Sequence, residues 1–366
     1  MVHSSHTPEA RARNHMPASH LASALLVMGM VLVAAPAHAQ LDAGRLQPGN
    51  LPASFLAALA APPRLQDDGG ALPRWLPYVD NRAAQSYVLS RGGITPAQRT
   101  TWEAQMRDML TALKTAPVLS RALGVDYEPS SSMMLVADEF FGLGGVRSAA
   151  LGGSLNIGAF RHADVVTTAD GRLRTAPGAH TAHFLMSVNL IPAIPPGPWM
   201  RDDAGSFFPR RVDGTFDGLP IHGSALVLTR ENRSPYRPVS WERAISAFLA
   251  SHLKDTQSAG SAREMLARMN AAERQQQAHV CSEMQRWSLE HCFVTADTRH
   301  AVPLVSVDTA FFDSRLPRTT IQIVTVEALN NATKGSEPGS PNSPFAIHLA
   351  LVQQTNWKAF RDRFVR

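Results

Sequence analysis

The chain has 366 residues, of which 44% are hydrophobic, and it carries a formal net charge of +5 at pH 7. This length suits one large domain or two small ones, and the apolar fraction is sufficient for a buried core. Arginine supplies most of the positive charge. Because the arginines are scattered rather than clustered with aromatic residues, the composition argues against nucleic-acid binding.

The N-terminus has the pattern of an export signal. Arg11 and Arg13 precede an uncharged apolar segment, and Ala37 and Ala39 stand at the −3 and −1 positions of a signal-peptidase site. The apolar run is shorter than the roughly 20 residues of a spanning helix, although a retained N-terminal anchor stays open. The sequence therefore predicts a signal peptide over 1–39 and an exported mature domain over 40–366, periplasmic or extracellular, without a membrane span.

A helix is expected first, over Thr95–Ala116. Thr95 is a good N-cap, Pro96 suits the first turn, and Pro117 ends the helix. Its predicted buried face comprises Trp102, Met106, Met109, Leu110 and Leu113. Runs of β-branched and apolar residues then predict strands at Ser132–Ala137, Ser154–Phe160, His183–Ile191, Ser224–Thr229, Thr320–Glu327 and Phe345–Val352.

A helical region interrupts the strands. Helices are expected over Trp241–His252 and Ser261–Glu290, separated by Asp255–Gly260, so 241–292 forms an inserted helical hairpin. Their predicted buried side chains are Phe248, Leu249, Met265, Leu266 and Met269. A last helix follows Thr355. Strands in series with inserted helices predict an α+β fold with a largely antiparallel sheet and packed helices.

The segment Leu226–Leu249 concentrates charged residues between a strand and a helix. A polar turn precedes a short extended piece, Ser240 is placed to cap the helix, and Glu242 suits its first turn. The sequence therefore predicts a strand-to-helix junction. The alternative is a site in which Arg233 and Arg237 hold an anion.

The cysteines Cys281 and Cys292 lie in the part predicted to be exported, where pairing is common. A continuous helix through both would separate them by roughly 16 Å, whereas a disulfide tolerates about 7 Å between Cα atoms. A bond requires the helix to end early, and both outcomes stay open.

No catalytic or metal motif is complete. His180 and His183 fall three apart in an expected strand, which places them on opposite faces, and two histidines do not make a closed zinc site. Ser251–Lys254 matches S-x-x-K without companion motifs, and Ser154 lacks the last glycine of G-x-S-x-G. We therefore expect no metal and no cofactor.

A dispersed catalytic site stays possible, because triad members need not be adjacent in sequence. Asp308, Asp313, Arg315 and Arg318 are expected to close a turn through Asp–Arg pairs. An enzyme would require some of the acids and histidines to converge in one cleft, namely Asp202 or Asp203, His180 or His183, and Asp308 or Asp313.

A long connection with many Pro and Gly residues joins two expected strands over residues 192–223, and such connections are often functional. One interpretation is that its aromatic residues cover a sheet face. The other is a binding rim in which Trp199 stacks on a ligand, Arg201, Arg210 and Arg211 hold an anionic group, and Asp202 or Asp203 accepts hydroxyl hydrogen bonds.

These patterns favour a non-enzymatic binding or envelope-assembly module. Its expected partners are an envelope glycan, an anionic ligand or an envelope protein. The alternative is an envelope hydrolase, of carboxylate or dispersed-triad type, that acts on a glycan, peptide or ester.

Overall fold

The computed structural model describes residues 46–47, 65–67, 69–80, 94–135, 150–176, 182–191, 200–203, 205–210, 212–222, 225–250, 257–281, 293–298, 301–308, 310–327 and 342–366. The predicted signal peptide lies outside these ranges and stays a prediction.

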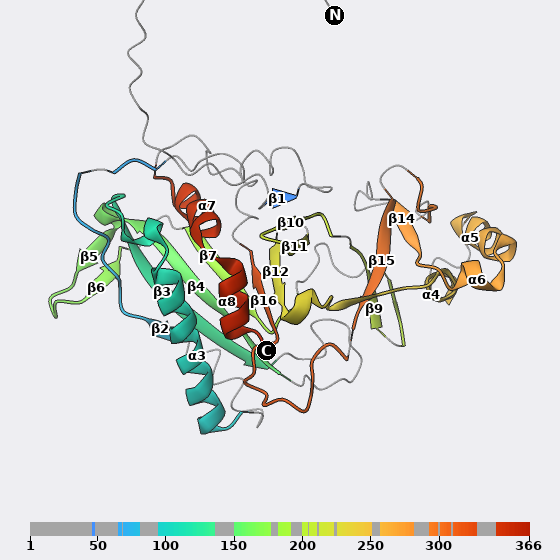
Figure 1. Cartoon of the computed structure of the whole chain (residues 1–366), viewed down its shortest axis with the longest axis horizontal. Coiled ribbons are helices and arrows are strands. Elements are labelled where there is room, and N and C mark those ends of the chain that lie inside the picture. The colour runs from blue at the N-terminus through green and yellow to red at the C-terminus, as the bar shows by residue number, and fades with distance from the viewer. Residues whose placement is uncertain are drawn as a thin grey trace, which may run out of the picture. The chain divides into compact units, whose positions relative to one another are not determined.

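The largest element is a nine-stranded sheet (Figure 1). Every pairing in it is antiparallel except the edge pair β2–β3, so the predicted α+β class with a largely antiparallel sheet is confirmed. The strand order is β1 (Leu46–Gln47), β10 (Gly214–Phe216), β11 (Leu219–His222), β12 (Ala225–Thr229), β16 (Ile323–Val326), β7 (Ala182–Val188), β4 (Leu151–Arg161), β3 (Val125–Leu135) and β2 (Val79–Asp80).

The strands predicted in the middle of the sheet are confirmed. β4, β7, β12 and β16 occupy their expected segments, whereas β3 begins earlier than predicted, at Val125. β3 and β4 pair along their whole length, from Val125 opposite Arg161 to Leu135 opposite Leu151. This register fixes which side chains share each face of the sheet.

One face of this sheet carries the main core. Helix α3 (Pro96–Lys114) buries the predicted face, from Trp102 to Leu113, and a capping box at Thr95 begins it. The 3₁₀ turn η1 (Pro117–Ser120) and helix α8 (Trp357–Phe364) add to the same core. Trp357 stacks on Phe184 of β7, with ring centroids 6.4 Å apart.

The strand predicted at 345–352 is wrong, because this segment is helix α7 (Pro344–Gln354). Ser343 caps it by accepting a hydrogen bond from the Ala346 backbone N–H at 3.1 Å. Residues from Ala346 to Val352 are all buried, so the helix has no polar face. A helix buried on every side shows the continuous apolar run of a buried strand.

A second sheet follows the order β13 (Tyr236–Pro238), β15 (Ala301–Val307), β9 (Gly205–Pro209) and β8 (Met200–Asp202), with β14 (His279–Cys281) also paired to β15. Helices α4 (Trp241–Ala250) and α5 (Gln257–Arg268) share a hydrophobic cluster with it, and the short helix α6 (Ala271–Arg274) follows them. A separate hairpin joins β5 (Val165–Thr167) to β6 (Leu173–Thr175).

The expected helical hairpin is correct for its first part and wrong for its end. α5 begins four residues before Ser261 and ends at Arg268, and Cys281 lies in strand β14 rather than in a helix. One continuous helix therefore does not run through both cysteines, and the separation of roughly 16 Å expected for such a helix does not apply. Cys292 lies outside the described residues, so the pairing stays a prediction. On the helices, Phe248 is fully buried, whereas Leu249, Met265, Leu266 and Met269 are partly buried against the same cluster.

The long connection over residues 192–223 contains strands that the sequence analysis did not predict. Residues 200–222 contain strands β8 to β11, in two hairpins. Phe207, Phe208 and Phe216 are buried in the cores of the two sheets. These three phenylalanines therefore cover sheet faces, whereas Trp199 lies outside the described residues.

Candidate functional site

A ligand-sized cavity lies beside the second sheet. Its volume is about 720 Å³, and it is bounded by α4, α5, α6, β14 and residues 295–296. Small-molecule sites commonly measure about 300–1,000 Å³ and combine apolar walls with a few polar groups. The size of the cavity therefore makes it a candidate ligand site.

Three long side chains supply its apolar wall. Trp241, at the start of α4, is buried and lies 5.8 Å from the Phe293 ring. Met265 lies in the last turn of α5 and Met269 directly follows its end, and both side chains line the cavity. Methionine side chains are flexible and polarizable, and they adapt to apolar or aromatic ligands.

Polar side chains from β14 and the residues before it line the cavity beside this wall. The imidazole Nδ1 of His279 lies 3.0 Å from the Gln277 carbonyl oxygen. The Gln277 side-chain amide donates to the Leu304 carbonyl at 3.0 Å. Both side chains line the cavity and are held by backbone groups of the second sheet.

The mouth of the cavity carries charges of both signs. Glu264 and Arg268 are one turn apart on α5, and Arg268 Nη2 lies 3.5 Å from Glu264 Oε2. Both are largely exposed, so water screens this pair. Glu273 closes a capping box by accepting a hydrogen bond from the Asn270 backbone N–H at 2.7 Å.

The predicted rim residues Asp202, Asp203 and Arg210 do not line this cavity. Asp202 accepts two hydrogen bonds from Arg243, from Nε at 2.7 Å and from Nη2 at 2.9 Å, while Asp203 is exposed. Arg210 is buried, donates to the His222 carbonyl at 3.3 Å and faces the Tyr236 ring. The backbone of Arg201 lies in β8. Trp199 and Arg211 are outside the described residues, so the rim stays a prediction.

The strand-to-helix junction has the predicted order, with β12, β13 and α4 in succession. Ser240 Oγ accepts a hydrogen bond from the Arg243 backbone N–H at 3.3 Å. Arg233 donates to the Ala310 carbonyl at 3.0 Å, and Arg237 Nε to Ser306 Oγ at 3.4 Å. These contacts give both arginines structural partners.

The acids and the histidine proposed for a dispersed triad belong to different networks. Asp308 lies 3.5 Å from Arg233, and Asp313 pairs with Arg315 at 2.8 Å, as the Asp–Arg turn predicted. Asp202 is held by Arg243, and His183 Nδ1 lies 2.8 Å from Asn156 Nδ2. His180 is outside the described residues.

A polar cluster that the sequence did not reveal lies on the second face of the nine-stranded sheet. Glu128 of β3 and His183 of β7 both pair with Gly158 of β4, so they flank a position without a side chain. Burial raises the pKa of Glu128, and the nearby charge of His183 partly offsets this. Partial burial lowers the pKa of His183, against the opposing effect of Glu128. Asn156 stands between His183 and Ser130, to which its amide donates at 3.4 Å.

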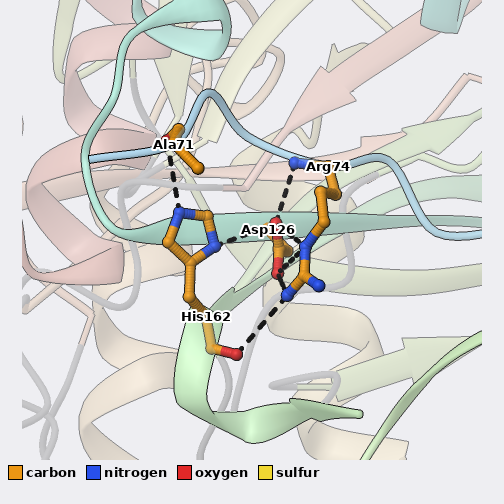
Figure 2. A network of polar contacts seen from close by, with 4 residues as sticks. All are labelled: Ala71, Arg74, Asp126 and His162. Carbon is orange, nitrogen blue, oxygen red and sulfur yellow. Dashed lines mark hydrogen bonds and ion pairs between the residues drawn. The ribbon is translucent and has the colours of Figure 1, made fainter. Parts of the chain in front are cut away.

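A second network ties the segment before β2 to the sheet. Figure 2 shows the Asp126 carboxylate between Arg74 and His162. Asp126 is fully buried and accepts from the Arg74 backbone N–H at 2.8 Å and from Arg74 Nη2 at 2.5 Å. His162 Nδ1 lies 3.0 Å from Asp126, and its Nε2 lies 3.4 Å from the Ala71 carbonyl (Figure 2). Because Asp126 is fully buried and joins Arg74 to β3, we interpret this network as structural.

No family model matches the chain, and no curated protein or solved structure is similar to it. Within the described ranges, no helix has the length and apolarity needed to cross a membrane. In that same part of the chain, no three His, Cys, Asp or Glu side chains are grouped so that they could hold a metal ion.

Proposed function

We propose that the protein is an exported, non-enzymatic binding module and that the cavity between α4, α5, α6 and β14 holds its ligand. The observation that carries this proposal is the cavity itself, with a volume of about 720 Å³ and a wall of Trp241, Met265 and Met269. Apolar walls with few polar groups are typical of small-molecule sites. The N-terminal signal pattern supports export, where such modules bind solutes or envelope components.

Blocking the cavity tests this function. Ser261 lines the cavity and is exposed, so Ser261→Trp adds a large ring at the cavity without changing the core. Ala267 lies on the same helix, is exposed and does not line the cavity, so Ala267→Trp is the matched control. Both variants should keep the melting temperature of the wild type.

The readout is the NMR signals of ¹³C-labelled methionine methyl groups during titration with a library of amphipathic fragments. Signals of Met265 and Met269 are identified by replacing each with leucine. Fragments that bind in the cavity should shift these two signals in the wild type and in Ala267→Trp, but not in Ser261→Trp. Absence of shifts in the wild type, or equal shifts in both tryptophan variants, would contradict the proposal.

A further inference from the structure

The charged groups around the cavity are unequal in number. Among the described lining residues, Glu264 and Glu273 supply two carboxylates and Arg268 supplies one guanidinium. Arg268 pairs with Glu264 at 3.5 Å, which largely cancels these two charges. The described lining residues therefore carry one more carboxylate than guanidinium, which favours a cationic ligand group.

The hydrogen-bonding pattern of the lining points in the same direction. The Gln277 carbonyl can only accept, so the His279 Nδ1 that lies 3.0 Å from it carries the hydrogen. In a neutral imidazole the other nitrogen is then an acceptor, and Nε2 of His279 has no hydrogen-bond partner among the described residues. Gln277 directs its NH₂ group to the Leu304 carbonyl at 3.0 Å, which leaves its side-chain oxygen as an acceptor.

The apolar wall fits the remaining part of such a ligand. Trp241 presents an aromatic ring, and the two methionines present thioether groups, which make favourable contacts with aromatic rings. A cation close to a tryptophan face is also attracted by the ring electrons. A ligand with a cationic hydrogen-bond donor and an apolar body would match the carboxylates, the acceptor atoms and the apolar wall of the cavity.

We propose, as an extension that rests on the function proposed above, that the cavity takes a small primary amine with an apolar or aromatic body. The body packs on Trp241, Met265 and Met269. The ammonium group donates to His279 Nε2 and Gln277 Oε1, and it lies within the negative field of Glu264 and Glu273.

Three probes of nearly equal shape test the charge preference. They are 2-phenylethylamine, which is cationic, 2-phenylethanol, which is neutral, and phenylacetate, which is anionic. Titrations of the wild-type protein are followed by the methyl signals of Met265 and Met269. We expect the amine to bind about three- to tenfold more tightly than the alcohol, and phenylacetate to bind most weakly, because each partly screened charge contributes roughly a factor of two to five.

Two variants of opposite sign on the same helix add a second, independent measurement. Glu264 and Arg268 are 73% and 82% exposed, so Glu264→Gln and Arg268→Gln should leave the fold intact. Removing the carboxylate should weaken amine binding about two- to fivefold, and removing the guanidinium should strengthen it by a similar factor. Binding of the neutral alcohol should change little in either variant.

The outcomes separate this inference from the proposed function. Binding of phenylacetate as tight as that of the amine, at signals of Met265 and Met269, overturns the amine assignment and leaves a ligand-binding cavity. Equal effects of the two charge variants on amine binding overturn it as well. If none of the three probes shifts the signal of Met265 or Met269, the amine assignment is overturned. If no fragment of the whole library shifts either signal, the proposed function of the cavity is overturned as well.

Discussion

Replacing Asp126 with asparagine removes the charge at the centre of the network that holds the segment before β2. The asparagine keeps the size of the side chain and one acceptor oxygen, but it places an NH₂ group among donors. Breaking a fully buried ion pair costs roughly 3–5 kcal/mol. Here the partners Arg74 and His162 are 39% and 26% exposed and regain contact with water. We therefore expect the free energy of unfolding to fall by about 2–3 kcal/mol at pH 7.

This loss should depend on pH. Burial alone would raise the pKa of Asp126, but the hydrogen bonds from Arg74 and His162 outweigh burial, and the pKa lies below its ordinary value. A carboxyl group with a depressed folded-state pKa stabilises the fold above its unfolded pKa of about 3.9, and this stabilisation disappears as the pH falls through the folded-state value. The difference between the wild type and Asp126→Asn should be full at pH 7 and 5 and should shrink below about pH 4.

Urea unfolding followed by far-UV circular dichroism measures this difference, with the slope of the transition as a check on compactness. Asp170→Asn is the control, because Asp170 is an exposed carboxylate paired with Arg172, and we expect no measurable change. Limited trypsin digestion after Arg74 should be faster in Asp126→Asn, since the segment is then held less firmly. A free energy within 0.5 kcal/mol of the wild type (about one surface contact), or a difference that persists unchanged to pH 2.5, would refute the reasoning.

Three further predictions concern packing and processing. A Cβ atom on Gly153 would collide with the backbone of β3 and lie 2.9 Å from Trp102 Cζ2, so Gly153→Ala should cost at least about 2 kcal/mol in urea unfolding. Gly260 lies in helix α5 with open space around it, so Gly260→Ala should instead raise the free energy of unfolding by about 0.5–1 kcal/mol. Equal changes in the free energy of unfolding for the two glycine variants would disprove the register of β4. Phe248→Ala should cost about 3–5 kcal/mol and the half-buried Leu249→Ala clearly less, by the same measurement; the reverse order would contradict the assigned helix face. N-terminal sequencing of the exported protein should begin at Gln40, whereas a full-length cytoplasmic product would end the export proposal.

Sequence periodicity predicted helices where one face alone is buried. The residues from Trp102 to Leu113 recur at helical spacing because the other face of α3 meets water, and capping at Thr95 marks its start. α7 gave no such pattern, since both of its faces are buried between Ala346 and Val352. Its remaining signal was Ser343 followed by Pro344, which is typical of a helix start.

The second sheet was largely missed because its strands are short and their partners are distant. β9 spans Gly205–Pro209 and pairs with β15, about a hundred residues later in the chain, around Val305 opposite Phe208. Short strands next to Gly and Pro have the composition of a loop, and nothing local identifies the partner. The same limit explains why the end of the expected helix at 261–290 was wrong, where β14 pairs with Ala301.

The candidate site depends on tertiary structure in the same way. The cavity is lined from separate segments, and residues such as Met265, Gln277 and His279 belong to no motif. The pairing of Glu128 with His183 follows from the register of three strands around Gly158, which the sequence does not display. The local Asp–Arg turn at Asp313 and Arg315 was predicted, because it needs only neighbouring residues.

The two edges of the nine-stranded sheet are formed by the first two strands in the described part of the chain. β1 pairs with β10 at one edge, and β2 pairs with β3 at the other. During synthesis these two strands appear before their partners, so their pairing must wait until the later strands have been made. Until then the outer backbone groups of β3 and β10 can pair with a second chain. In the folded chain, β1 and β2 therefore cover backbone groups of β10 and β3 that could otherwise pair with a second chain.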